Sequence, residues 1–107
     1  MNVQFKKGVL ELCVLALVEQ RDRYGYELVE RISRQIEIAE GTVYPLLRRL
    51  TDEGYFETYL QESAEGPPRK YYRITTHGRM TLAALRHEWQ QFAKGVSALL
   101  NESSVHD

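Results

Sequence analysis

The chain of 107 residues carries 14 basic and 15 acidic side chains, and 43% of it is hydrophobic. This length allows one domain with a small core, and no apolar run approaches the roughly 18 residues of a membrane span. The single cysteine, Cys13, excludes an internal disulfide and a thiolate metal cluster. The apolar N-terminal stretch is interrupted by Glu11 and has no signal-peptide cleavage site, so we expect a cytoplasmic protein.

The basic residues are unevenly distributed along the chain. A net charge of −1 is unusual for a protein that binds nucleic acid. However, two segments, 41–50 and 66–74, contain no acidic residue and hold five basic ones, namely Arg48, Arg49, Arg69, Lys70 and Arg73. These segments are therefore candidates for contact with an anionic partner such as DNA.

Three helices are predicted in the first half of the chain. Residues 6–19 are good helix formers that are apolar on every side, which indicates burial on more than one side. Residues 24–36 follow a charged turn at 20–23 and form an amphipathic second helix. Residues 40–53 repeat apolar side chains at helical spacing and are followed by Gly54, a residue typical of helix ends.

Two strands and a long helix are predicted in the second half. Residues 55–61 and 70–74 favour antiparallel strands because of their aromatic and β-branched residues and their alternation, and the polar segment 62–69 would form an exposed loop between them. Thr75 is then predicted to be the N-cap of a long helix that runs to about Leu99.

This order of elements predicts a mainly α fold with a small β-hairpin (α+β), namely a winged helix-turn-helix with an N-terminal helix and a long C-terminal helix. We expect a DNA-binding domain at residues 1–75, a dimerisation helix at 76–100 and a flexible tail at 101–107. The recognition helix at about 40–53 would read the major groove, and the wing at about 62–70 would contact the DNA backbone.

The start of the recognition helix carries the residues expected to contact DNA. Thr42, Tyr44, Arg48 and Arg49 would bind phosphate or base edges. Alternatively, Tyr44 belongs to the core and the arginines form a solvated face. Pro45 lies inside the predicted helix, where it removes a hydrogen bond to the carbonyl four residues earlier and indicates a bent helix start.

The predicted wing loop combines a stiff backbone with positive charge. Pro67 and Pro68 restrict its conformation, and Arg69 and Lys70 place two cations at its tip. Basic loops are common in proteins, so this pattern indicates a phosphate contact only in combination with the recognition helix.

The final helix carries an apolar seam that has no obvious partner elsewhere in the chain. Its members are spaced alternately by three and four residues, the pattern of a helix that packs against another helix. We therefore expect a homodimer to which the first helix also contributes. The expected interface residues are Leu10, Val14, Leu17, Leu82, Leu85, Trp89, Phe92, Val96 and Leu99. Trp89 and Phe92 would either stack against a planar aromatic ligand or form plain interface core.

The segment GTVYPLLRRLTDEGYFE resembles the motif G-T-[LV]-Y-P-L-L-x-R-L-x-x-x-G of the PadR family of bacterial transcriptional regulators. The segments PPRKYYRITTHG and YGYEL are also similar to that family, and the resemblance covers almost the whole chain. The positions that match its recognition-helix and wing motifs are Thr42, Tyr44, Pro45, Arg69, Lys70 and Tyr71.

This resemblance implies a homodimeric repressor that binds a palindromic operator. It also implies an effector, because some small members of the family release DNA when a flat aromatic drug or a phenolic compound binds. The chain departs from the family at Pro67-Pro68, where a glycine often precedes the proline, and at Ala39-Glu40, where a Ser-Pro cap is frequent.

Neither a metal site nor an active site is indicated. His77, His87 and His106 have no second ligand at metal-binding spacing, and no nucleophile stands with a base and an orienting acid. We therefore expect no metal, no cofactor and no catalysis. Two alternatives to a DNA-binding regulator stay open, namely a winged-helix module for protein interaction and a ligand-binding dimer without DNA binding.

Overall fold

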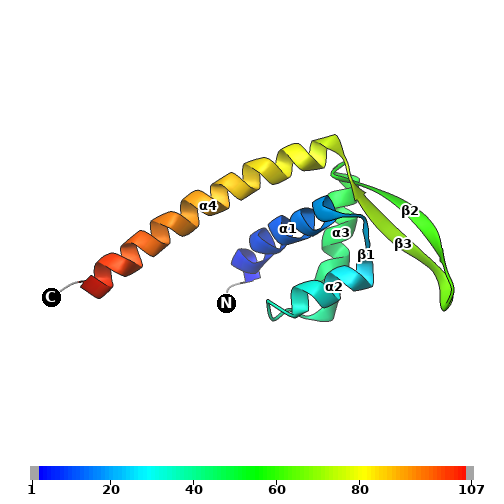
Figure 1. The fold of residues 1–107 in the computed structure, drawn as a ribbon, viewed down its shortest axis with the longest axis horizontal. Helices are drawn as coiled ribbons and strands as arrows, with labels where there is room; N and C mark the ends of the chain where they lie inside the picture. Colours follow the sequence, from blue (N-terminus) through cyan, green and yellow to red (C-terminus); the bar gives the residue numbers. More distant parts are fainter. Residues whose placement is uncertain (1–2, 106–107) are drawn as a thin grey trace.

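The computed structural model describes residues 3–105 and combines four α-helices with a small antiparallel sheet, which confirms the α+β prediction. The elements in chain order are α1 (Val3–Gln20), β1 (Arg23–Tyr24), α2 (Gly25–Ser33), a 3₁₀ turn (Glu40–Thr42), α3 (Val43–Asp52), β2 (Phe56–Ser63), β3 (Gly66–Ile74) and α4 (Thr76–Val105). Helices α1, α2 and α3 gather beside the sheet, and α4 projects far beyond them (Figure 1). The molecule is accordingly elongated, with extents of 62 × 27 × 21 Å.

The core lies where the first three helices meet the inner face of the sheet. Helix α1 contributes four side chains that are at most 1% exposed, because its apolar residues face α2 and α3 on one side and β3 and α4 on others. The buried core residues are Leu10, Val14, Leu15, Val18, Leu28, Val29, Ile32, Val43, Leu47, Leu50, Phe56, Tyr72, Ile74 and Leu82. No helix in the part of the chain that the structure describes is long and apolar enough to cross a membrane.

The segment predicted as a charged turn contains a short strand. Strand β1 pairs with β3, with Arg23 opposite Tyr72 and Tyr24 opposite Tyr71, so the sheet has the order β1-β3-β2. Arg23 is only 5% exposed. This strand was missed because a two-residue segment has no periodicity, and because an arginine at its centre is not typical of a buried strand.

Each of the three nitrogens of the buried Arg23 guanidinium has a hydrogen-bond acceptor. Its Nε donates to the carbonyl oxygen of Leu17 at 2.8 Å, and its Nη2 donates to Oε1 of Gln20 at 2.8 Å. Its Nη1 lies 3.0 Å from a carboxylate oxygen of Glu27 in the first turn of α2. The side chain therefore ties the end of α1 to the start of α2.

The recognition helix begins later than predicted, and this changes the interpretation of Pro45. A 3₁₀ turn covers Glu40–Thr42, and α3 begins at Val43. Pro45 is therefore in the first turn of the α-helix, where a backbone N–H has no helical partner and its loss costs little. The predicted placement of Pro45 in the helix interior was wrong. At the other end, Gly54 has a φ of +84°, which confirms the expected stop.

The predicted wing loop at 62–69 is mostly strand. Strands β2 and β3 extend to Ser63 and from Gly66, so only residues 64 and 65 lie between them. Pro67 and Pro68 lie within β3, beside an irregularity in the register of β2. Strand β1 pairs with β3 only at residues 71 and 72. The edge of β3 that faces away from β2 is therefore unpaired near the prolines, and their missing backbone N–H groups are tolerated there.

Helix α4 begins as predicted and continues further. The hydroxyl of Thr75 accepts a hydrogen bond from the backbone N–H of Gly78 at 3.0 Å, which confirms the N-cap. The helix runs to Val105, beyond the expected end near Leu99. The segment predicted as a flexible tail is therefore helical up to Val105, and residues 106–107 lie outside the described residues.

Replacing Arg23 by methionine is expected to lower the free energy of unfolding by about 3 kcal/mol, because partly buried acceptors, the Glu27 carboxylate among them, lose the guanidinium. The matched control is Arg34→Met. Arg34 pairs with Glu30 at 2.9 Å with side chains 60% and 50% exposed, so its loss should cost less than about 0.5 kcal/mol. Urea unfolding measures both values. Equal losses would contradict the role given to Arg23.

Candidate nucleic-acid interface

Helix α3 presents one face to the core and a second face outward. Val43, Leu47 and Leu50 are fully buried. Tyr44 and Arg48 lie on the exposed side, and Tyr44 is 40% exposed, so the alternative that Tyr44 belongs to the core is not supported. The ring of Tyr44 lies against α2, since a Cβ added at Gly25 would be 2.8 Å from its Cε1.

The outward face of α3 and the wing line a common hollow of about 180 Å³. Arg48 of α3 and Lys70 of β3 bring positive charge to it from two different elements. The lining residues are Tyr44, Arg48, Thr51, Asp52, Lys70 and Tyr72. Sequence reasoning did not select Thr51 or Asp52 as contacts. They follow Tyr44 by seven and eight residues, and this helical spacing could have identified them.

Strand alternation separates the predicted wing residues. Tyr72 and Ile74 are buried on the inner face of β3, so Lys70 also belongs to the face that adjoins α3, whereas Arg69 and Tyr71 belong to the outer face. The structure therefore brings Lys70 together with the recognition helix, but not Arg69 or Tyr71.

The outer face of the sheet is held by a cluster of tyrosine rings. Tyr71 lies between Tyr24, at a centroid distance of 5.5 Å, and Tyr59, at 5.6 Å. The guanidinium of Arg69 lies over the Tyr24 ring at 4.5 Å, and that of Arg73 over the Tyr59 ring at 4.8 Å. These contacts stabilise the base of the wing.

Asp22 connects this cluster to the loop after α1. It accepts a hydrogen bond from the Tyr59 hydroxyl at 2.6 Å, and the same carboxylate oxygen lies 3.4 Å from Nε of Arg73. The hydrogen bond to Asp22 raises the pKa of Tyr59 above its ordinary value. The charge of Arg73 is therefore compensated within the protein.

Arg49 also has acidic neighbours. Its Nη1 lies 3.0 Å from a carboxylate oxygen of Glu53, the residue that caps the end of α3, and its Nη2 lies 3.4 Å from a carboxylate oxygen of Glu11 in α1. Partial burial acts to lower the pKa of Arg49, but the hydrogen bonds and negative charges of Glu53 and Glu11 outweigh it, so the pKa is raised. Arg48 and Arg49 are adjacent in sequence, yet they have different surroundings.

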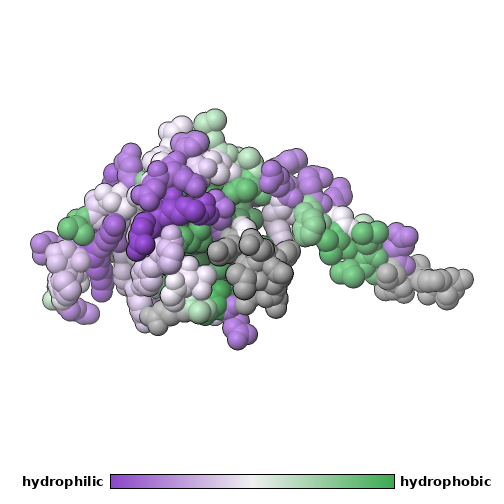
Figure 2. Space-filling view, turned by 180° about the vertical axis from the view of Figure 1, so that it is seen from behind, coloured by the Kyte–Doolittle hydropathy of each residue, from purple (hydrophilic) through white to green (hydrophobic). Residues whose placement is uncertain are grey.

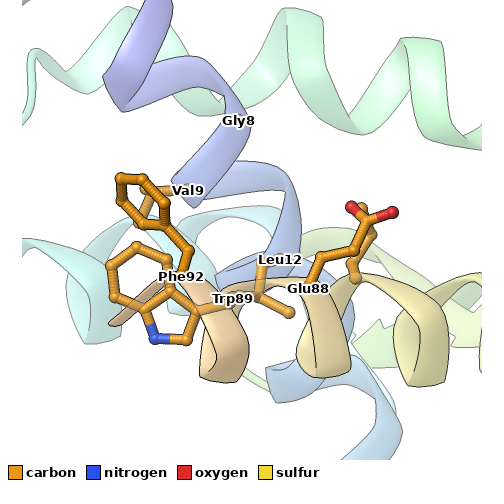
Figure 3. A pocket seen from close by; sticks show the side chains of 7 residues that line it. Gly8, Val9, Leu12, Glu88, Trp89 and Phe92 are labelled. Carbon is orange, nitrogen blue, oxygen red and sulfur yellow. The ribbon is translucent and has the colours of Figure 1, made fainter. Parts of the chain in front are cut away.

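A second hollow of about 360 Å³ lies between α1 and α4 (Figure 3). The rings of Trp89 and Phe92 have centroids 6.2 Å apart at its edge, with Val9 of α1 close to them (Figure 3). The other lining residues are Gly8, Leu12, Leu85 and Glu88. The hollow is thus predominantly apolar, with one carboxylate among its lining residues.

An exposed apolar stripe continues from this hollow along α4. Trp89 and Val96 are each 39% exposed, Phe92 is 54% exposed and Leu99 is 66% exposed. Figure 2 shows hydrophobic side chains gathered on the projecting part of the molecule. Such a stripe on one helix is the kind of surface that another helix covers.

Three residues expected at the dimer interface belong instead to the core of the chain. Leu10, Val14 and Leu82 are 1%, 0% and 0% exposed. A second copy cannot reach these side chains directly, so the prediction for them is corrected. Leu17 and Leu85 are partly buried against the same core. The sequence could not separate the two cases, because a helix that packs on its own chain and one that packs on a partner have similar apolar spacing.

No group of three His, Cys, Asp or Glu side chains within residues described by the structure is arranged to hold a metal ion. Burial raises the pKa of the Cys13 thiol, which keeps it protonated at neutral pH. A protonated and partly buried thiol is a poor nucleophile and a poor metal ligand.

Helices α2 and α3, followed by a two-stranded wing that shares a hollow with α3, define a winged helix-turn-helix, a class of fold that binds DNA. The family model of the PadR-like transcriptional regulators matches residues 14–84. The chain belongs to this family. It is therefore a transcriptional regulator and not an enzyme.

Three individual proteins are similar to this chain over most of its length. A transcriptional regulator of Mycobacterium tuberculosis is 29% identical, with 87% of each chain covered. A PadR-like transcriptional regulator of Bacillus cereus is 39% identical in its crystal structure, with a TM-score of 0.82 over 91% of this chain and 96% of that one. A Streptococcus mutans protein of known crystal structure is 35% identical, with a TM-score of 0.84 over 94% of each chain.

Proposed function

We propose that this PadR-like regulator is a bacterial, cytoplasmic homodimer that represses transcription by binding a palindromic operator. The supporting observation is the common hollow of α3 and the wing, which Arg48 of α3 and Lys70 of β3 both line. Helix α3 would enter the major groove with Thr42, Tyr44 and Pro45 at its leading end. Lys70 would reach the phosphate backbone from the wing.

Arg48 and Lys70 are suited to this role because their charges are available. Arg48 forms no ion pair with a carboxylate of the described residues, in contrast to Arg49 and Arg73. Lys70 extends past the ring of Tyr72, with Nζ 5.9 Å from its centroid. Arg69, near the tip of the wing, could add a further phosphate contact from the outer face. Tyr71 would act by supporting the wing.

The homodimer would form through the exposed stripe of α4. Removing Trp89, Phe92, Val96 and Leu99 from water in both copies supplies the stabilisation that two small domains need to associate. Leu85 and Leu17 would lie at the edge of this contact. The two recognition helices should then read half-sites separated by about one turn of DNA, or roughly 34 Å.

An effector would bind in the hollow between α1 and α4. Trp89 and Phe92 offer aromatic faces for a planar aromatic compound, and α1 closes the other side. Because these residues also belong to the proposed dimer contact, a ligand there would change the angle between the two DNA-reading domains. It would release the operator if it bound the released dimer more tightly than the DNA-competent one.

Replacing Arg48 or Lys70 by glutamine should weaken DNA binding and flatten its salt dependence, with the slope of log K against log salt reduced by about 0.9 for each lost phosphate contact. Fluorescence anisotropy with DNA from upstream of the protein's own gene measures this. The matched control is Arg86→Gln, which removes the same charge from α4, where Arg86 lies 3.4 Å from Glu19. Equal effects of all three variants would contradict the proposed interface.

The same titration separates the proposal from its two alternatives. A wild-type protein that binds no duplex selectively, although folded and dimeric, would favour a protein-interaction module or a ligand-binding dimer without DNA binding. Selective binding that is strengthened at low salt would support the regulator.

Replacing Val96 by lysine should convert the dimer to monomer, because a charge would be buried in the proposed contact. The control is Ala98→Lys, which places the same side chain about 160° further round the helix, away from the stripe. Sedimentation equilibrium measures the oligomeric state, and circular dichroism confirms that both variants stay folded. A dimer that persists in Val96→Lys would refute this arrangement of α4.

A planar aromatic dye should quench the fluorescence of Trp89, which is the single tryptophan of the chain. Phe92→Ala should weaken dye binding by roughly a factor of ten, since one stacking partner is lost. Tyr26→Ala is a suitable control, because Tyr26 is also exposed but lies on α2. Quenching no greater than that of free tryptophan in solution would exclude this effector site.

A further inference from the structure

The two neighbouring arginines of α3 have opposite electrostatic surroundings. Arg48 faces the hollow shared with Lys70, on the side of the wing. Arg49 faces α1 and lies between the carboxylates of Glu11 and Glu53. The sequence pattern treats them as one basic pair, but among the described residues only Arg49 of the two has carboxylates within ion-pair distance.

Both terminal nitrogens of Arg49 have carboxylate partners inside the protein. Its Nη1 donates to both carboxylate oxygens of Glu53, at 3.0 and 3.2 Å. Its Nη2 lies 3.4 Å from Oε2 of Glu11. A DNA phosphate would compete with these carboxylates for the N–H groups of Arg49, because guanidinium binds phosphate through a fork of parallel N–H groups. The side chain of Arg49 is nevertheless 48% exposed, so an anion outside the protein could reach it.

We propose that Glu11, together with Glu53, withholds Arg49 from the DNA backbone, so that helix α1 sets how many cations the recognition helix offers to DNA. This inference rests on the proposed DNA-binding function. Arg49 is a positioning residue in the state described, where it ties α3 to α1. It becomes a phosphate contact when Glu11 no longer pairs with it.

The contacts of Arg49 with Glu53 and with Glu11 depend differently on the tertiary structure. Glu53 lies four residues after Arg49 as the C-cap of α3, and its backbone N–H bonds to the Arg49 carbonyl, so it moves with Arg49. Glu11 belongs to another helix, and its distance from Arg49 changes with any shift of α1 relative to α3. The contact is partly shielded, because the Glu11 side chain is 21% exposed. Glu11 is therefore the partner that a conformational change would remove first.

Helix α1 is placed to transmit such a change. Leu10 lines a hollow of about 210 Å³ together with Arg49, Pro45 and other residues of α3. Val9 and Leu12, which neighbour Leu10 in α1, line the other hollow, to which Trp89 belongs. One stretch of α1 thus contacts both the recognition helix and the hollow proposed for effectors.

The test is a double-mutant cycle of wild type, Glu11→Gln, Arg49→Gln and the double variant, titrated with a mixed-sequence duplex at several salt concentrations. Glu11→Gln should steepen the slope of log K against log salt by about 0.9 and tighten binding at low salt by about threefold. Arg49→Gln should leave the slope of the wild type unchanged. The double variant should match Arg49→Gln, because the gain requires a free Arg49.

Glu19→Gln is the matched control. Glu19 also lies on α1 and pairs with an arginine, Arg86, at 3.4 Å, but that arginine belongs to α4. Its substitution removes the same charge and should not change the slope. Glu53→Gln leaves the α1–α3 contact in place and should shift the slope in the same direction as Glu11→Gln. Thermal unfolding checks that each variant is folded.

Two results would overturn the inference while leaving the proposed function intact. The first is a slope for Glu11→Gln equal to that for Glu19→Gln. The second is a flatter slope for Arg49→Gln alone, which would show that Arg49 already contacts DNA in the wild type. Absence of DNA binding by the wild type would overturn the proposed function and this inference together.

Discussion

The buried guanidinium of Arg23 is the interaction on which the rest of the structure depends. Its partners come from the end of α1 and the first turn of α2, and the backbone of the same residue pairs with β3. A buried cation without these partners would be strongly unfavourable, so the arrangement is formed as a unit. It fixes how α2 leaves α1, and therefore where α3 can pack.

The packing of the helices around Arg23 explains how a protein with a net negative charge can present a DNA-reading surface. Arg48 and Lys70 come together only because α3 and β3 are held against the same core. Elsewhere, carboxylates compensate the cations, as Asp22 does for Arg73 and Glu53 does for Arg49. A surface with few free cations binds duplex DNA weakly in general, which leaves discrimination between sequences to the fit of the helix and the wing.

Helix α4 has two parts with different roles. Its first turns are anchored to the core through Leu82, and beyond Leu85, as far as Leu99, its large apolar residues are at least 39% exposed. Trp89 and Phe92 stand where these parts meet, beside Val9 of α1. A partner helix and a small ligand would therefore share the same surface, and this sharing gives the ligand a physical means to alter the dimer. Through Glu11, the same region of α1 reaches Arg49.

The sequence by itself determined the helices, the hairpin, the Thr75 cap, the Gly54 stop and the family, because periodicity, capping residues and the motif around Tyr44 act over short distances. Only the tertiary structure decided the rest. It showed that Leu10 and Val14 are core, that β1 exists and that Arg48 and Arg49 have different partners. These outcomes depend on residues far apart in the chain, and a local pattern of apolar or basic residues does not specify which surface it will meet.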